Sequence, residues 1–199
     1  MKRKISIFLT FVFCLSLFMC SCTGGGTAPK GNKVLFEIDG IGEFVIELMP
    51  EYAPETVANF KKLVSEEFYN GLIFHRVIPG FMAQGGDPDG TGRGGSDKKI
   101  KGEFSSNGFS DNTLKHERGT VSMARTQDPN SASSQFFICF DDALYLDGEY
   151  AAFGKVVYGM ETVDKIGEAV TDDNDKPLSD VVINSARIIT DEEYQKYEQ

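Results

Sequence analysis

The sequence predicts a fold dominated by β-strands, in which an antiparallel sheet or barrel is capped by helices. Six or seven short apolar runs have the partial alternation of strands, whereas only one segment has a strong helical period. The regular alternation of strand and helix that accompanies a parallel sheet is therefore missing. Sixteen Phe and seven Tyr, without Trp, favour strands and an aromatic interior. The 199 residues fit one domain with short extensions.

The N-terminus has the pattern of an export signal. Residues 2–4 are basic, and residues 5–19 are apolar except for three hydroxyl side chains. This run is shorter than the roughly 20 residues of a membrane span, but it fits the apolar core of a signal peptide. We therefore expect the chain to be secreted across the cytoplasmic membrane.

The end of the apolar run resembles the lipobox of bacterial lipoproteins, in which a cysteine becomes the lipidated first residue. Cys22 follows the small residue Ser21, whereas Cys20 follows the bulky Met19. The resemblance implies a signal peptide over residues 1–21, lipidation of Cys22 and a lipid anchor in the cell membrane. Met19 stands where the lipobox prefers Leu, and an ordinary secretory signal cut nearby remains the alternative.

A tether and a hairpin come next. Residues 22–32 are rich in Gly and contain Pro29, which predicts a flexible tether. Two apolar, partly alternating runs follow at 33–39 and 43–49, with Gly40-Ile41-Gly42 between them. This arrangement predicts a β-hairpin.

An amphipathic helix is predicted over residues 54–66. Pro54 suits the first helical turn, and Val57, Phe60 and Val64 recur at three- and four-residue steps. Glu and Lys occupy the other side, so the helix should bury one face.

Turn signals delimit the next strand and a long loop. Asn70-Gly71 predicts a turn, residues 72–78 a strand, and Pro79-Gly80 its end. Residues 87–112 are mostly Gly, Asp, Lys and Ser, which predicts a long surface loop. Loops of this length in compact domains are usually functional or disordered.

The remaining elements are shorter. We expect strands at 119–124, 135–140, 151–157 and 181–189, a short helix at 159–166, a loop at 172–177 and a polar tail at 191–199.

Two stretches carry the chemistry. Residues 74–87 place one guanidinium (Arg76), one primary amide (Gln84) and the apolar Phe81 and Met82 among glycines. Residues 134–140 again place an amide among aromatic side chains. No nucleophile with a base and no metal-ligand cluster accompanies the first stretch, so the combination predicts a site that grips and polarises an amide without attacking it.

The order of these motifs resembles the cyclophilin-type peptidyl-prolyl cis–trans isomerases. The matching blocks are Phe-His-Arg-Val-Ile-Pro-Gly-Phe-Met-Ala-Gln-Gly-Gly-Asp at 74–87, Gly-Thr-Gly at 90–92, Val-Ser-Met-Ala at 121–124, Ser-Gln-Phe-Phe-Ile at 134–138, Leu-Asp-Gly at 146–148 and Ala-Phe-Gly-Lys-Val at 152–156. The resemblance implies a domain over residues 33–190 that forms a closed eight-stranded antiparallel β-barrel with two capping helices. It also implies catalysis without a cofactor or metal.

The resemblance also assigns roles. Arg76 is the expected catalytic arginine, and Gln84 is expected to hydrogen-bond the substrate backbone. The expected substrate-binding residues are Phe81, Met82 and Phe137 in the proline pocket, Leu146 at its rim, Gly90 and Gln135 in the groove beside it, Ala124, Arg125 and Thr126 along the peptide, and Tyr145 and Tyr150.

Three of these positions depart from the best-known eukaryotic members. Tyr145 replaces a Trp, which argues against tight cyclosporin binding. Tyr150 replaces a pocket His and keeps an aromatic wall with a hydroxyl group. Arg125 stands where Asn is common, and its charge could alter which peptides bind.

The residue types suit amide rotation. The barrier of about 18–20 kcal/mol arises because resonance must be broken, and the prolyl nitrogen recovers its lone pair at the top of that barrier. A guanidinium aimed at this nitrogen binds the twisted state better than the planar one, which is what accelerates a step. Arg76 is the expected donor, although a structural ion-pair arginine is the competing interpretation.

Four other side chains have simpler interpretations. His75 and Phe136 are expected in the core, because strand neighbours of site residues face the opposite way. Cys139 is expected to be a buried small hydrophobe, and His116, which lies among charges, is expected on the surface.

Two function classes remain open from the sequence. The first is a monomeric prolyl isomerase that acts on proline-containing peptides and folding proteins. The second is a binding module that holds proline-containing segments with incidental catalysis. A lipid-anchored binding protein of a transporter fits the anchor but not a small barrel. The net charge of −10 argues against nucleic acid as a partner.

Overall fold

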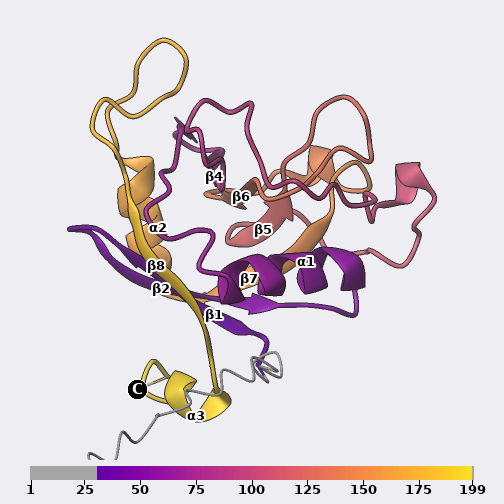
Figure 1. The fold of residues 1–199 in the computed structure, drawn as a ribbon, viewed down its shortest axis with the longest axis horizontal. Coiled ribbons are helices and arrows are strands. Elements are labelled where there is room, and N and C mark those ends of the chain that lie inside the picture. Colours follow the sequence, from indigo (N-terminus) through magenta and orange to yellow (C-terminus); the bar gives the residue numbers. More distant parts are fainter. Residues whose placement is uncertain (1–30, 199) are drawn as a thin grey trace, which may run out of the picture.

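Residues 31–198 are described by the computed structural model, and they form one sheet with helices around it (Figure 1). The strands are β1 (Lys33–Ile38), β2 (Gly42–Leu48), β3 (Arg76–Ile78), β4 (Met82–Gly85), β5 (Thr120–Met123), β6 (Phe136–Cys139), β7 (Ala152–Tyr158) and β8 (Ile183–Ile189). The α-helices are α1 (Pro54–Ser65), α2 (Met160–Gly167) and α3 (Asp191–Tyr194), and short 3₁₀ helices lie at Ser105–Asn107 and Leu144–Leu146.

The sheet is antiparallel throughout and runs in the order β3-β4-β6-β5-β7-β2-β1-β8. The prediction of a mostly β, eight-stranded antiparallel fold with helices is confirmed. The predicted closure into a barrel is wrong, because the edge strands β3 and β8 are not paired with each other. Residues 71–74 and 181–183 are linked by one bridge, between Ile73 and Val182, and by three backbone hydrogen bonds, which do not continue into a ladder between the two strands. The fold is therefore a curled, open half-barrel.

The short β3 explains why the sheet stays open. Residues 72–78 were expected to form one strand, but only 76–78 do. Phe74 N donates to Val181 O at 2.9 Å, whereas Val77 N donates to Asp175 O at 2.8 Å. The chain thus leaves the β8 side before β3 begins, and no continuous ladder can form.

The core lies on the concave face of the sheet and is largely aromatic. Phe60 of α1 is fully buried, and its ring lies 5.5 Å from that of Phe136 in an edge-to-face arrangement. Phe36 and Phe44, cross-strand partners in the predicted hairpin, stack at 4.9 Å. This packing confirms the aromatic interior and positions β6.

Helix α1 begins where predicted, at Pro54, but its N-terminal cap comes from a distant residue. The Glu103 carboxylate accepts hydrogen bonds from Glu55 N, Thr56 N and Thr56 Oγ1 at 2.9, 2.8 and 2.7 Å. Free N–H groups and the helix dipole both favour an anion there. This contact fixes the long loop 87–112 to the domain.

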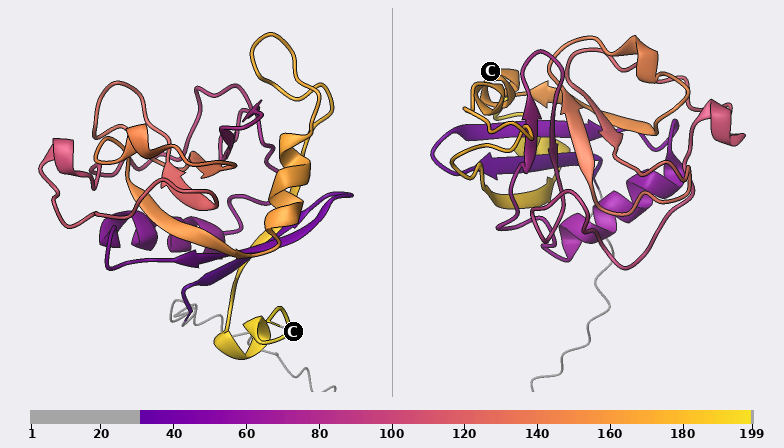
Figure 2. Two further views of the ribbon diagram at one scale, coloured as in Figure 1. Left: turned by 180° about the vertical axis from the view of Figure 1, so that it is seen from behind. Right: turned by 90° about the horizontal axis from the view of Figure 1, so that it is seen from above.

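The polar tail contains helix α3, which we did not predict (Figure 2). Thr190 and Glu193 form a reciprocal capping box. Tyr194 packs against Leu35, Val45 and Ile189 and is 9% exposed. The spacing Thr-x-x-Glu at 190–193 was a readable helix signal.

The predicted signal peptide, the lipidation at Cys22 and nearly all of the tether lie outside the described residues. Within residues 31–198, no helix is long and apolar enough to cross a bilayer.

Candidate active site

Strand register brings the two chemical stretches together. Arg76 pairs with Gln84 across β3 and β4, and Gln84 pairs with Phe137 across β4 and β6. Directly opposite residues point to the same face of a sheet, so the three side chains form one row. Their neighbour Phe136 points the other way, into the aromatic core, as predicted.

A pocket of about 170 Å³ opens over this row, and we call it the apolar pocket after the apolar side chains, such as Met82 and Phe137, that form most of its wall. It is lined by Arg76, Phe81, Met82, Gln84, Ala124, Arg125, Phe137, Leu146 and Tyr150. All nine were predicted site residues. Phe137 and Tyr150 meet edge-to-face with ring centroids 5.9 Å apart, which gives the pocket an aromatic corner.

Arg76 lines the pocket and remains partly exposed to solvent. Its side chain is 43% exposed, and Nε donates to Asp175 Oδ2 at 3.2 Å. Within residues 31–198, neither terminal guanidinium nitrogen of Arg76 forms a hydrogen bond. The ion pair of the competing interpretation therefore exists, but its hydrogen bond uses Nε and leaves the terminal nitrogens of a pocket-lining residue free to donate.

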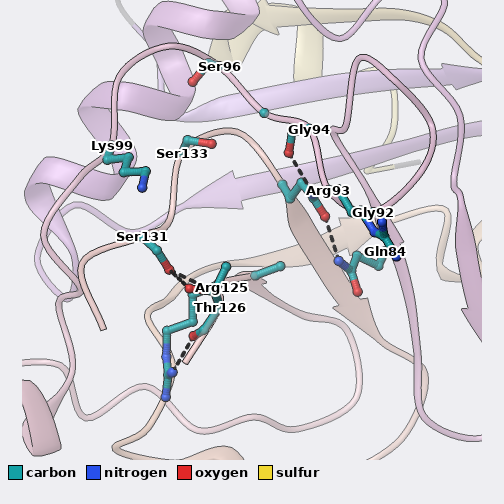
Figure 3. Close-up of a pocket in the computed structure, with 13 residues that line it drawn as sticks. Gln84, Gly92, Arg93, Gly94, Ser96, Lys99, Arg125, Thr126, Ser131 and Ser133 are labelled. Atoms are coloured by element: carbon teal, nitrogen blue, oxygen red, sulfur yellow. Dashed lines mark hydrogen bonds between the residues drawn. The ribbon is translucent and has the colours of Figure 1, made fainter. Parts of the chain in front are cut away.

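Gln84 is held by a chain of amides. Gln84 Nε2 donates to Gln135 Oε1 at 2.7 Å, and Gln135 Nε2 donates to Gly94 O at 2.7 Å (Figure 3). This chain fixes the amide orientation and leaves Gln84 Oε1 as the acceptor directed to the groove.

Two larger cavities adjoin this pocket, and both share Gln84 and Arg125 with it. One, of about 470 Å³, is lined by the predicted residues Ala124, Thr126 and Gln135 and by Arg93, Gly94, Ser96, Lys99, Ser131 and Ser133 (Figure 3). The other, of about 510 Å³, contains Gly90, His75, Arg76 and residues of the loop 172–177. The predicted groove residues therefore lie on both sides of the apolar pocket.

Tyr145 is the predicted site residue that lines none of these three cavities. It is 70% exposed, and its ring lies 5.9 Å from that of Phe81. It therefore extends the pocket rim rather than its wall.

Arg125 forms a fixed partition between the cavities. Its Nη2 and Nε donate to Glu149 O at 2.9 and 3.1 Å. Its guanidinium also lies over the rings of Tyr150 and Phe104, at 4.5 and 5.1 Å. Three supports of this kind hold a planar cation in one orientation.

Comparison with known proteins identifies the relatives of this chain. A family model for cyclophilin type peptidyl-prolyl cis-trans isomerases matches residues 33–188. The chain belongs to this family.

Individual relatives agree with that assignment. A probable peptidyl-prolyl cis-trans isomerase of Brucella suis is 47% identical over 156 residues, which cover 72% of this chain and 75% of the relative. A peptidyl-prolyl cis-trans isomerase-like 1 protein of Gibberella zeae is 44% identical over 157 residues, covering 77% and 93%. This chain is a cyclophilin-type isomerase by the same evidence.

A solved structure has the same fold. The cyclophilin of Cryptosporidium parvum, crystallised in the presence of the dipeptide Ala-Pro, aligns with a TM-score of 0.72 and 34% identity. The alignment covers 80% of this chain and 99% of that protein.

The interpretation of His116 as a surface residue is wrong. The residue is fully buried, and its ring stacks behind Phe137 with centroids 6.1 Å apart. Burial lowers the pKa of the imidazole although the Asp147 carboxylate opposes this shift. Its neighbours Lys115 and Glu117 are exposed, because only the ring of His116 turns inward.

His116 joins a Ser-His-Asp chain that cannot act as a nucleophilic triad. Asp147 Oδ1 accepts from His116 N and Nδ1 at 2.9 and 3.0 Å, so Nε2 accepts from Ser122 Oγ at 2.9 Å. Ser122 is fully buried and no substrate can reach it. In this cyclophilin, the hydrogen-bonded residues Ser122, His116 and Asp147 hold the His116 ring in place behind the ring of Phe137.

His75 and Cys139 are buried, as predicted. His75 is 5% exposed, and neither ring nitrogen has a partner among the described residues. Burial lowers the pKa of His75, and burial raises the pKa of Cys139 to about 12, so that thiol is unreactive.

Asp87, the last residue of the first motif, organises the loop behind the groove. Its carboxylate accepts from the backbone N–H groups of Asp89, Thr91, Gly92 and Gly94 at 2.6–3.2 Å. Burial alone would raise the pKa of Asp87, but these hydrogen bonds outweigh it and hold the pKa below 3.8. We did not assign Asp87 a role, although its place before a Gly-rich run was a usable signal.

Asp87→Asn is expected to destabilise this loop, because an amide offers one acceptor oxygen and adds two donors. The expected cost is about 1–3 kcal/mol, measured by urea unfolding and by faster exchange of the Gly92 and Gly94 amides. Since the folded pKa is depressed, the carboxylate stabilises the parent above about pH 4 and this contribution is lost as the pH falls through the folded pKa. The difference between parent and variant should therefore shrink in acid, and a difference independent of pH would contradict this account.

Proposed function

We propose that this cyclophilin accelerates rotation about X–Pro bonds without a covalent intermediate, through Arg76 and an apolar proline pocket. The observation that carries the proposal is the row of Arg76, Gln84 and Phe137 across three adjacent strands. It places a cationic donor, an amide acceptor and an aromatic wall around one cavity.

The chemistry follows from the order of these groups. A proline ring seated against Phe137 and Met82 is fixed, while the rest of the peptide can turn. Gln84 Oε1 accepts from a backbone N–H of the peptide. The free guanidinium nitrogens of Arg76 then donate to the prolyl nitrogen, whose lone pair is available only in the twisted amide.

The pocket supplies a second contribution. A twisted amide is less dipolar than a planar one, so an apolar wall stabilises it relative to water. Met82 and Phe137 are 2% and 5% exposed, so the surrounding protein fixes both side chains in that wall. The Cryptosporidium parvum cyclophilin was crystallised in the presence of the dipeptide Ala-Pro, which supports proline peptides as the ligands.

Prolyl cis–trans exchange in a short Ala-Pro peptide, followed by NMR, tests the proposal. Fast exchange that depends on the protein, with peptide-induced shifts at Phe137, Gln84 and Arg125, is the expected result. Peptide binding without accelerated exchange would instead support the binding-module interpretation, in which the groove holds proline segments.

We also propose that the protein acts outside the cytoplasmic membrane on a lipid anchor at Cys22. The support is sequence alone: a basic start, a short apolar run, and Cys22 after the small Ser21. The Gly-rich tether that follows would separate the anchor from the domain.

Replacement of Cys22 by alanine is expected to release the protein from the membrane fraction and abolish labelling with a radioactive fatty acid. The variant Cys20→Ala serves as the matched control and should remain labelled. Loss of labelling only in Cys20→Ala would move the anchor to Cys20. Absence of labelling in the parent and in both variants would favour an ordinary secretory signal.

A further inference from the structure

Asp175, in the loop between α2 and β8, holds the guanidinium of Arg76. We infer that Asp175 is a positioning residue for the isomerase reaction, and that its carboxylate aims the terminal nitrogens of Arg76 into the apolar pocket. This inference rests on the proposed role of Arg76. The sequence predicted only a loop here, and Asp175 lies 99 residues away from Arg76 in the chain.

The contact is made at two adjacent points. Asp175 Oδ2 accepts from Arg76 Nε at 3.2 Å, and Asp175 O accepts from the backbone N–H of Val77 at 2.8 Å. The backbone bond fixes the loop to β3 at Val77, and the side-chain bond fixes the residue before it, Arg76. Because Nε forms the hydrogen bond and the two terminal nitrogens form none, the ion pair can orient these donors and still leave them available to a peptide.

The loop that carries Asp175 is held in shape by its own hydrogen bonds, independently of Arg76. Asp172 Oδ1 accepts from Asn174 N and Lys176 N at 2.8 and 2.9 Å, and Asp172 N donates to Lys176 O at 2.8 Å. Thr171 and Pro177 form a bridge at its base. The loop projects beyond the sheet (Figure 2), yet it presents Asp175 from a closed turn.

The backbone at Asp175 favours a different residue. Its φ is +63°, in the left-handed region that glycine adopts most readily. Aspartate tolerates this region better than most side chains, but glycine would relax it. Replacement of Asp175 by glycine should therefore remove the carboxylate without straining the loop.

The ion pair between Arg76 and Asp175 should contribute little to the free energy of unfolding. Both side chains are about two-fifths exposed, at 43% and 41%, and exposed ion pairs contribute little to folding. Removing the carboxylate should therefore leave the fold intact and change the orientation of Arg76. A small misplacement of a catalytic group costs far more in rate than in stability.

Asp175→Gly tests the inference, because it removes the carboxylate, suits the backbone and keeps the bond from Val77 N. We expect kcat for an Ala-Pro peptide to fall about tenfold, with the peptide Kd unchanged. The Arg76 Nε–H resonance should also lose its protection from solvent exchange. Asp175→Asn keeps an acceptor at this position and should lose less activity. Asp173→Gly, a change at an exposed position in the same loop, is the control and should match the parent.

A double-variant comparison separates this role from the proposed function. In the Arg76→Ala background, Asp175→Gly should cause no further loss. An equal loss in both backgrounds, or full activity of Asp175→Gly when Arg76→Ala is impaired, would overturn the positioning role alone. If Arg76→Ala itself keeps full activity, the proposed mechanism is wrong and the role of Asp175 is wrong with it.

Discussion

Arg76→Ala is expected to lower kcat/KM for X–Pro isomerisation by about two to three decades. One preorganised donor aimed at developing charge is worth about 2.7–4 kcal/mol, and each tenfold change in rate corresponds to about 1.36 kcal/mol. The loss should fall on kcat, because the guanidinium meets a lone pair that exists only in the twisted amide. NMR exchange measurements at saturating peptide would report it.

Two comparisons make that result specific. Arg76→Lys keeps the positive charge but loses the planar fork and the Nε contact to Asp175, so it should recover little of the activity. Arg187→Ala removes another exposed arginine with an ion pair, to Glu193 at 3.0 Å, and should leave the rate unchanged. Parent-like activity in Arg76→Ala would show that Arg76 is not the donor to the prolyl nitrogen, and catalysis would then be attributed to the pocket.

The sequence predicted those strands and helices whose signals lie in a few neighbouring residues. The hairpin of β1 and β2 followed from two alternating runs around glycines, and α1 began at Pro54. The site residues followed from their motif blocks, and strand register then placed Arg76 opposite Gln84. The register itself was not predicted, because β4 is only four residues long, Met-Ala-Gln-Gly, and was not recognised as a strand.

Contacts between distant residues account for the errors. The cap of α1 by Glu103, the ion pair of Arg76 with Asp175 and the burial of His116 all depend on tertiary packing. His116 stands between two charged residues, and we predicted a surface position for it for that reason. The open sheet has the same origin, since the course of residues 72–75 is set by bonds to the segment before β8.

Phe136→Ala should lower mainly the stability and Phe137→Ala mainly the activity, although the two residues are adjacent on β6. Phe136 is fully buried among aromatic rings, with Tyr69 and Phe60 each 5.5 Å away. Its truncation leaves a cavity that rigid neighbours cannot fill, and the expected cost is about 3–5 kcal/mol of unfolding free energy. Folds of this size have about 5–15 kcal/mol to lose, so the variant should remain folded but unfold at much lower urea.

Phe137 faces the proline pocket, so its truncation enlarges a cavity that is already open to peptide. Phe137→Ala should therefore cost less stability than Phe136→Ala and should weaken proline binding and exchange strongly. Urea unfolding and NMR exchange on the same two samples measure both quantities. The folded fraction of Phe136→Ala should turn over peptide at the parent rate, because its row of Arg76, Gln84 and Phe137 is intact. Equal losses of stability and of activity in the two variants would show that the faces of β6 do not divide core from site.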